Sequence, residues 1–229
     1  EDLSRGLGDV YKRQQLNLSI EELVSKFFGI SNYANIFNRT YRSGIGINSY
    51  KKGGFIIDCP KKNLNDSHVI FKSKFPNSWK IILLFDNKKK GLHGKTEKSF
   101  FLPSSSNTLR KQLSDILVNE IIPAVSYRDF DVFSKGLTEF QKLNYSFYSS
   151  IQKSMYLSSD IAKVIKDISK RFKVGVGQSS WGPTSYIFVN SKQDLKDILP
   201  VLNQTISMYN NLSYDVVSVK NNGRKLTTI

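Results

Sequence analysis

The chain has 229 residues, of which 39% are hydrophobic, and carries a formal net charge of +15 at pH 7. This length suits one large domain or two small ones, with enough apolar residues for a core. No apolar run approaches the length of a membrane span. The single cysteine, Cys59, excludes an internal disulfide and a cysteine-based zinc site, and two histidines are too few for a histidine-rich metal centre. We therefore expect a protein of the reducing cytoplasm with no membrane association and no metal site of its own.

The positive charge makes nucleic acid one candidate partner. However, the lysines are scattered or stand in short runs at residues 51–52, 61–62 and 88–90, without interleaved aromatic residues for base stacking. A positive surface would also attract phosphorylated small molecules. We therefore expect small-molecule substrates and no nucleic acid, and keep a non-catalytic basic module as an alternative.

The first fourteen residues, which end G-L-G-D-V-Y-K-R-Q, resemble translated sequencing-adaptor read-through. They are left out of the fold prediction. On this interpretation the natural protein begins upstream. Residues 16–28 follow with an apolar stripe of helical spacing, which predicts a helix that ends at Gly29.

Residues 41–59 read Y-R-S-G-I-G-I-N-S-Y-K-K-G-G-F-I-I-D-C. The alternation predicts a hairpin with strands at 45–50 and 54–58 around a turn at 51–53. Residues 61–77 are polar and predict an exposed loop, whereas the apolar run 79–85 predicts a strand covered on both faces. In the loop that follows, Lys95 could meet a phosphate and Glu97 a metal or hydroxyl, although a solvated surface charge explains either residue equally simply.

Apolar stripes then predict helices at 108–121, stopped by Pro123, at about 129–143 and at 160–170. Two β-prone runs flank residues 178–184. Ser191 is a candidate N-cap for a further helix, which Pro200 should kink or interrupt, and residues 214–219 predict a last strand. The order from residue 79 is β-α-β-β-α-β with extra helices in the first crossover. This plan predicts an α+β fold, a ferredoxin-like antiparallel sheet with helices on one face.

Residues 174–184, V-G-V-G-Q-S-S-W-G-P-T, are the most informative stretch. Three glycines allow positive φ or close backbone approach, and the Gln, Ser and Thr side chains offer hydrogen-bond donors. Such a loop suits an anionic ligand, whose oxygens accept several hydrogen bonds at once. An ordinary hairpin connection with turn glycines is the simpler interpretation.

The string G-V-G-Q-S-S-W-G-P-T resembles the signature of archaeal β-ribofuranosylaminobenzene 5′-phosphate synthases, which are members of the GHMP kinase superfamily. The R-S-G-I-G…G-G spacing at residues 42–54 resembles a second segment of the same family. There, many of the superfamily's kinases have a catalytic aspartate where Gly46 stands in this chain. The closing V-S-V-K-N-N-G-R resembles the usual C-terminal end of the synthases.

The resemblance implies a two-domain GHMP-kinase-like architecture. Residues 15–75 would be the remnant of an S5-like N-terminal domain and residues 76–229 the ferredoxin-like C-terminal domain. It also implies a pentosyltransferase that joins phosphoribosyl pyrophosphate to p-aminobenzoate or p-hydroxybenzoate with loss of pyrophosphate and CO₂, in methanopterin biosynthesis. Mg²⁺ would accompany the donor, and the oligomeric state, including a homodimer, stays open.

On this resemblance the catalytic candidates are Gln178, Ser179 and Ser180. The substrate-binding candidates are Arg42, Ser43, Gly44, Gly46, Gly175, Gly177, Trp181, Gly182 and Thr184. Arg42 would hold the acid's carboxylate and Trp181 would stack on its ring, although a buried packing role explains Trp181 equally well. The alternative is an ATP-dependent GHMP-type small-molecule kinase, which the glycine at position 46 disfavours because glycine cannot act as a base.

Overall fold

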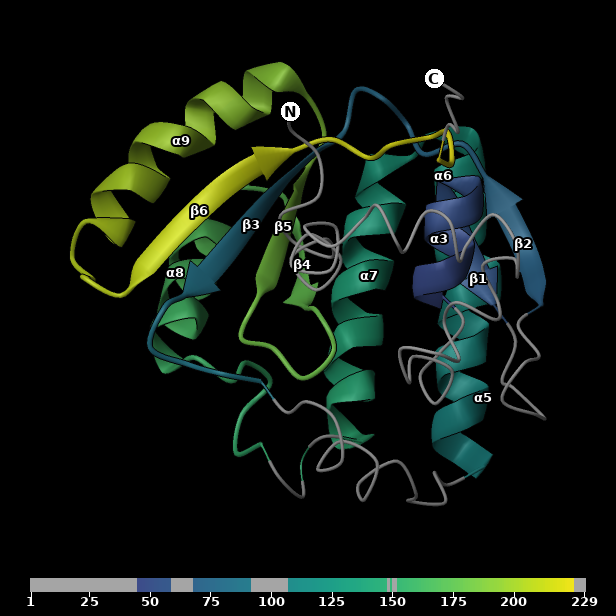
Figure 1. Ribbon diagram of the computed structural model, residues 1–229, viewed down its shortest axis with the longest axis horizontal. Helices are drawn as coiled ribbons and strands as arrows, with labels where there is room; N and C mark the ends of the chain where they lie inside the picture. The colour runs from purple at the N-terminus through teal and green to yellow at the C-terminus, as the bar shows by residue number, and fades with distance from the viewer. Residues whose placement is uncertain (1–44, 59–67, 92–106, 148, 150–151, 225–229) are drawn as a thin grey trace, which may run out of the picture. The chain divides into compact units, whose positions relative to one another are not determined.

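The computed structural model describes residues 45–58, 68–91, 107–147, 149 and 152–224. The chain divides into two compact units, one formed by residues 1–75 with 219–229 and the other by residues 76–218 (Figure 1). The predicted helix at 16–28 lies outside the described residues. The domain limits expected from the resemblance stay a prediction.

The larger unit is built on a four-stranded antiparallel sheet with the order β4-β5-β3-β6, visible side by side in Figure 1. Its strands are β3 (Lys80–Asp86), β4 (Gly175–Gln178), β5 (Ser185–Val189) and β6 (Leu212–Val217). This strand order is the one expected of a β-α-β-β-α-β unit. The predicted α+β, ferredoxin-like fold is therefore confirmed.

One face of this sheet carries the core. Strand residues Ile82, Leu84 and Ile187 alternate inward and pack against α8 (Ser159–Arg171) and α9 (Lys192–Ile206). The inward residues of the two helices are Ile161, Val164, Ile165, Ile168, Ile198 and Leu202, each 3% exposed or less. The 3.6-residue spacing of these side chains is what the sequence pattern indicated.

Helix α7 (Phe130–Asn144) lies along the edge strand β4, so the helices are not confined to one face. Its Thr138 Oγ1 accepts a hydrogen bond from the Val176 backbone N–H at 3.2 Å. Its Phe133 packs edge-to-face on Phe188, which points away from the α8–α9 side. The edge of the sheet is thus covered rather than left open for pairing.

The N-cap predicted at Ser191 is confirmed, and two further helices begin with caps of the same kind. Asp129 accepts from Val132 N at the start of α7, and Ser191 accepts from Asp194 N at the start of α9. Ser158 caps α8 in the same way through Ile161 N. Each side-chain oxygen satisfies an otherwise unpaired N–H of a first helical turn.

Neither Pro123, which was predicted to stop a helix, nor Pro200, which was predicted to kink or interrupt one, ends a helix. Pro123 lies in the first turn of α6 (Ile122–Tyr127), which follows α5 (Asn107–Ile116) and a π-helical turn, η1 (Leu117–Ile121). The π-turn shifts the hydrogen-bond register, and a first-turn proline needs no N–H donor. Pro200 lies inside α9 without interrupting it, because the inward residues Ile198 and Leu202 hold both halves of the helix on the core.

In the smaller unit, the prediction of a first hairpin strand at residues 45–50 is wrong. Residues Ile45–Lys52 form a helix, α3, and only β1 (Phe55–Asp58) is a strand. Gly53 N–H donates to Ser49 O at 2.8 Å, and Gly53 adopts a φ of 63°. The helix therefore ends in a left-handed glycine preceded by two lysines, both of which are helix-stop signals that outweigh a short alternation.

The expected loop at 61–77 contains a strand, β2 (Val69–Ser73), which pairs antiparallel with β1. Residues 219–224 belong to the same unit. Asn221 Oδ1 accepts from Phe75 N at 2.7 Å and its Nδ2 donates to Phe75 O at 2.9 Å. Gly54 N–H donates to Lys220 O at 2.9 Å.

Within the described ranges, no helix is long and apolar enough to cross a membrane.

Candidate functional site

The loop between β4 and β5 is a closed turn. Ser179 N–H donates to Thr184 O at 2.9 Å, and Gly182 N–H donates to Ser179 O at 3.0 Å. Ser180 and Gly182 adopt positive φ values of 52° and 65°, and the Gly182–Pro183 peptide is cis. The residues that the sequence pattern selects here therefore share one compact, ordered turn.

Gln178 lies under this turn, 4% exposed. Its Oε1 accepts from Leu157 N–H at 2.6 Å. Its Nε2 donates to Ser180 O at 3.0 Å and to Gln152 Oε1 at 3.1 Å. Both hydrogens of the Gln178 amide are thus donated to protein acceptors, and one of these bonds holds the backbone of the turn at Ser180.

The other loop candidates differ in exposure. Ser180 is exposed, Ser179 and Thr184 are half-buried, and Trp181 is buried with 8% exposure. Ser180 is therefore the loop hydroxyl best placed to meet a ligand from solvent, whereas the burial of Trp181 matches a packing role.

The strand glycines make room for neighbours. A Cβ on Gly177 would lie 2.4 Å from the hydroxyl of Tyr186, the residue paired with it across the strands. A Cβ on Gly175 would lie 3.0 Å from the Ser134 Cα of α7. In this structure, both glycines serve close packing.

A second backbone segment approaches the turn. A Cβ on Gly91 would lie only 2.1 Å from the Gly182 carbonyl oxygen. The segment that follows β3 therefore packs at Gly91 directly against the 179–184 turn.

The remaining candidates are not part of this turn. Arg42, Ser43 and Gly44 lie outside the described residues, as do Lys95 and Glu97. Gly46 is the second residue of α3, in the smaller unit. The structure thus brings together the candidates from 175 to 184.

Sequence reasoning missed Gln152. The resemblance described in the sequence analysis assigns it no role. In the structure it is 4% exposed and bonds to Gln178, 26 residues further along the chain. The available signal is a glutamine in a segment rich in Ser and Tyr, which by itself is too common to single out.

Asp86 closes strand β3 in a buried polar network. Its Oδ2 accepts from Ser158 Oγ at 2.6 Å and its Oδ1 from Lys88 N–H at 2.9 Å. Burial raises the pKa of Asp86, but hydrogen bonds from Ser158, Asn211 and Lys88, with the charge of Lys89, lower the pKa below its usual value on balance. The carboxylate therefore stays charged and anchors the start of α8.

Tyr156 contributes a second titratable group to the core. Burial, reinforced by Tyr186, raises the pKa of Tyr156, and its hydroxyl has no hydrogen-bond partner among the described residues. The phenol is held neutral and cannot serve as a base at neutral pH.

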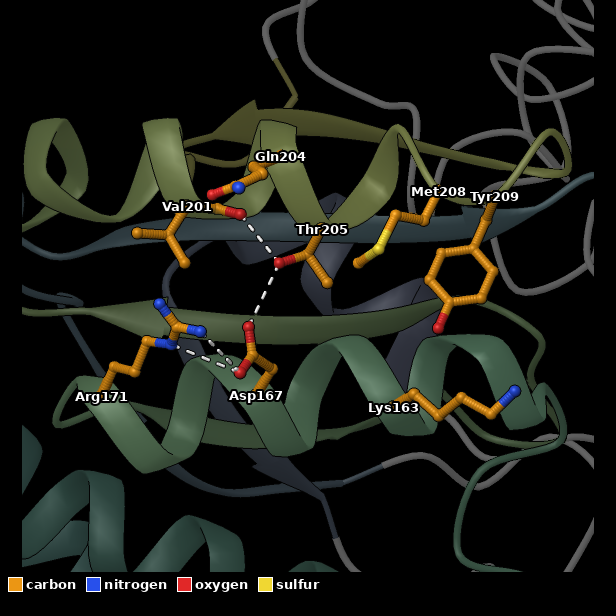
Figure 2. Close-up of a pocket in the computed structure, with 8 residues that line it drawn as sticks. All are labelled: Lys163, Asp167, Arg171, Val201, Gln204, Thr205, Met208 and Tyr209. Atoms are coloured by element: carbon orange, nitrogen blue, oxygen red, sulfur yellow. Dashed lines mark hydrogen bonds and ion pairs between the residues drawn. The ribbon is translucent and has the colours of Figure 1, made fainter.

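Figure 2 shows a groove of about 360 Å³ on the outer side of helices α8 and α9. Each charged side chain that lines it is already in an ion pair. Arg171 bonds Asp167 at 3.2 Å, and Lys163 bonds Asp160 at 3.2 Å. Thr205 Oγ1 donates to Asp167 Oδ2 at 3.2 Å. This neutralised lining favours no anionic ligand.

No group of three or more His, Cys, Asp or Glu side chains is arranged to hold a metal ion in the described part of the chain.

Comparison with known proteins identifies relatives of the chain. No protein-family model matches it. The β-ribofuranosylphenol 5′-phosphate synthase of Methanocaldococcus jannaschii is 30% identical over 203 residues, which cover 78% of this chain and 58% of that protein. The synthase of the same name from Methanothermobacter thermautotrophicus is 26% identical over 197 residues, with 78% and 59% coverage. The chain is a relative of these archaeal synthases. It spans a little under three fifths of their length.

Solved structures agree on the fold. Mevalonate diphosphate decarboxylase from Staphylococcus aureus superposes with a TM-score of 0.57 at 15% identity, over 81% of this chain and 58% of that one. Homoserine kinase from Cytophaga hutchinsonii gives 0.56 at 11% identity, over 79% and 53%. The chain thus shares the fold of this decarboxylase and this kinase. At these identities the likeness concerns the fold alone.

Proposed function

We propose that this chain takes part in a decarboxylating phosphoribosyl transfer, the joining of phosphoribosyl pyrophosphate to a para-substituted benzoate. The observation that carries the proposal is the likeness to archaeal enzymes named β-ribofuranosylphenol 5′-phosphate synthases over 78% of the chain. A phenol product carries a hydroxyl where an aminobenzene product carries an amine, so p-hydroxybenzoate is the first acid to test and p-aminobenzoate the second.

The reaction requires three bond changes within one active site. The bond between ribose C1 and the pyrophosphate oxygen breaks, and the electron pair leaves with pyrophosphate. A bond forms between C1 and the ring carbon that bears the carboxylate. The carbon–carboxylate bond then breaks, CO₂ leaves, and its electron pair restores the aromatic ring. The first event needs donors for the growing negative charge, and the second mainly needs orientation.

The turn between β4 and β5 offers such donors. Ser180 is exposed and Ser179 and Thr184 are half-buried, and we assign the three hydroxyls to the leaving pyrophosphate. The sequence pattern assigns Gln178 to the same role. Since its amide hydrogens already hold Ser180 O and Gln152, we propose that it acts by shaping the turn.

The aromatic acid needs a partner for its carboxylate. Arg42 is our candidate, because a guanidinium binds a carboxylate with two parallel hydrogen bonds. If so, Arg42→Ala should raise the KM for the acid at least about tenfold with little change for the donor. An unchanged KM for the acid would remove Arg42 from this role.

We further propose that Mg²⁺ enters with the donor and is held mainly by its phosphate oxygens, the ligands that this ion prefers. The high positive charge, +15 over the whole chain, would attract such phosphorylated substrates. We propose that the enzyme acts in the cytoplasm, in methanopterin biosynthesis, as the resemblance described in the sequence analysis implies.

A GHMP-type small-molecule kinase is the second candidate, favoured by the fold that the chain shares with homoserine kinase. Against it stands Gly46, the second residue of α3, at the position where the resemblance expects a catalytic aspartate. Glycine has no group that could accept the proton of an attacking hydroxyl.

One assay distinguishes the phosphoribosyl transfer from the kinase reaction. The complete gene product is incubated with phosphoribosyl pyrophosphate, Mg²⁺ and carboxyl-labelled p-hydroxybenzoate or p-aminobenzoate, and released CO₂ is counted. The proposal expects release that depends on the phosphoribosyl donor. Absence of release, with ATP consumed against an alcohol instead, would overturn it in favour of the kinase.

A further inference from the structure

Two buried glutamine side chains face each other beneath the 179–184 turn. Gln178 belongs to β4, and Gln152 to the segment between the 3₁₀ turn η2 (Tyr145–Phe147) and α8. Each is 4% exposed. Gln178 Nε2 donates to Gln152 Oε1 at 3.1 Å, and Gln152 Nε2 approaches Gln178 Oε1 at 3.5 Å. The two amides thus form a reciprocal pair.

The surrounding backbone determines how both amides are oriented. Leu157 N–H can only donate, and it meets Gln178 Oε1 at 2.6 Å. Ser180 O and Ser154 O can only accept, and they meet Gln178 Nε2 at 3.0 Å and Gln152 Nε2 at 2.7 Å. Rotating either amide by 180° would place like groups together at these contacts.

The pair supports a turn that is unfavourable by itself. Ser180 has a Cβ and yet adopts a φ of 52°, a left-handed conformation that residues other than glycine adopt at a cost. Its carbonyl is held in this conformation by Gln178 Nε2. On the other side of the turn, Gly182 lies so close that a Cβ would be 2.7 Å from Gln178 Oε1.

Gln152 occupies the two remaining hydrogen-bonding positions of the Gln178 amide, one at Nε2 and one at Oε1. If Gln152 could not bond, one hydrogen of Gln178 Nε2 would be left unpaired in a buried place, which is unfavourable. Gln178 could then turn toward other partners and release Ser180 O. Gln152 itself is held in place, since its backbone carbonyl accepts from Tyr145 Oη at 3.0 Å.

We propose that Gln152 is a positioning residue, which acts through Gln178 to keep the 179–184 turn in the shape that receives the pyrophosphate group of the donor. What the turn binds rests on the proposed function. That Gln152 orders the turn does not depend on it.

The first test needs no activity. The chain has two tryptophans, Trp79 and Trp181, so labelling with 5-fluorotryptophan gives one fluorine signal for each. Trp79→Phe assigns them. In Gln152→Leu, similar in size but unable to hydrogen-bond, the Trp181 signal should shift or broaden while the Trp79 signal stays. Gln141→Leu is the matched control, because Gln141 is 5% exposed and bonds the hydroxyl of Tyr186 instead of the turn.

The second test uses the decarboxylation assay. Gln152→Leu should raise the KM for phosphoribosyl pyrophosphate by about tenfold and leave the KM for the aromatic acid within about twofold. Should Gln152→Leu not fold, Gln152→Met replaces it, because it keeps the length of the side chain but offers Gln178 Nε2 only a weak thioether acceptor.

The outcomes are distinct. A moved Trp181 signal without any CO₂ release, in the wild type as well, supports the ordering role and overturns the proposed function. Release by the wild type, with an unmoved Trp181 signal and an unchanged KM in the variant, overturns the role of Gln152 alone.

Discussion

The hydroxyl of Tyr186 occupies the space into which a side chain on Gly177 would extend. The two residues are directly paired between β4 and β5, and a Cβ on Gly177 would meet the hydroxyl and two ring carbons of Tyr186 at 2.4, 2.5 and 2.8 Å. The same hydroxyl donates to Gln141 Oε1 of α7 at 3.2 Å. The glycine thus lets a tyrosine cross the edge strand and reach the covering helix.

Replacing Gly177 by alanine should therefore destabilise the larger unit. The ring of Tyr186 would have to move and would give up its bond to Gln141, with an expected loss of about 1–3 kcal/mol in the free energy of unfolding. Urea denaturation followed by circular dichroism measures it. Gly136→Ala in α7 is the control, since its Cβ would meet mainly the flexible Glu120 side chain and alanine favours a helix. Equal stability losses in the two variants would contradict this account.

A second prediction concerns Gly91. A Cβ there would lie 2.1 Å from the Gly182 carbonyl oxygen, which is backbone and cannot rotate away. Gly91→Ala should therefore displace the 179–184 turn and raise the KM for the phosphoribosyl donor by about tenfold or more, while the sheet stays folded. Steady-state kinetics with varied donor checks the KM, and far-ultraviolet circular dichroism checks the fold. A wild-type KM would mean that the two segments adjust at little cost.

A third prediction concerns Thr138, whose hydroxyl protects the edge of the sheet. Its Oγ1 accepts from Val176 N–H, the outward-facing donor of the edge strand. Thr138→Val keeps the shape but leaves this N–H without its acceptor, which should cost about 1–3 kcal/mol. Amide hydrogen exchange at Val176 should accelerate, whereas exchange at Ile187 in the neighbouring strand should change only with global stability. Unaltered protection of Val176 would argue against this role.

The network at Asp86 predicts a dependence of stability on pH. Because the folded state lowers the pKa of Asp86 below its ordinary value of 3.8, the charged carboxylate favours folding. This contribution is present above pH 3.8 and is lost as the pH falls through the lowered folded value. Denaturant unfolding between pH 2 and about 6 should thus be less pH-dependent in Asp86→Asn than in the wild type. Parallel curves for the two proteins would refute the assignment.

Much of the larger unit follows from local sequence. The apolar run at β3, the stripes of α7 and α8 and the N-cap at Ser191 predicted its elements, because each depends on residues three or four apart or on simple alternation. The Q-S-S-W-G-P string likewise points to the synthase relatives, because a resemblance of this kind is carried by consecutive residues.

Local rules failed where distant contacts or competing signals decide. Residues Ile45–Lys52 alternate like a strand but form α3, where the lysines and the left-handed Gly53 favour a helix end. Pro200 is kept inside α9 because Ile198 and Leu202 are buried on the sheet, and this packing outweighs one missing hydrogen bond.

The sequence by itself determined the order of strands and helices in the larger unit and the turn that carries the candidate site, since both depend on short, local patterns. Only the tertiary structure decided that Gln152 lies against Gln178 and that Gly91 touches Gly182. These contacts join segments 26 or more residues apart, and they form because a buried amide must satisfy its hydrogen bonds wherever the fold supplies a partner.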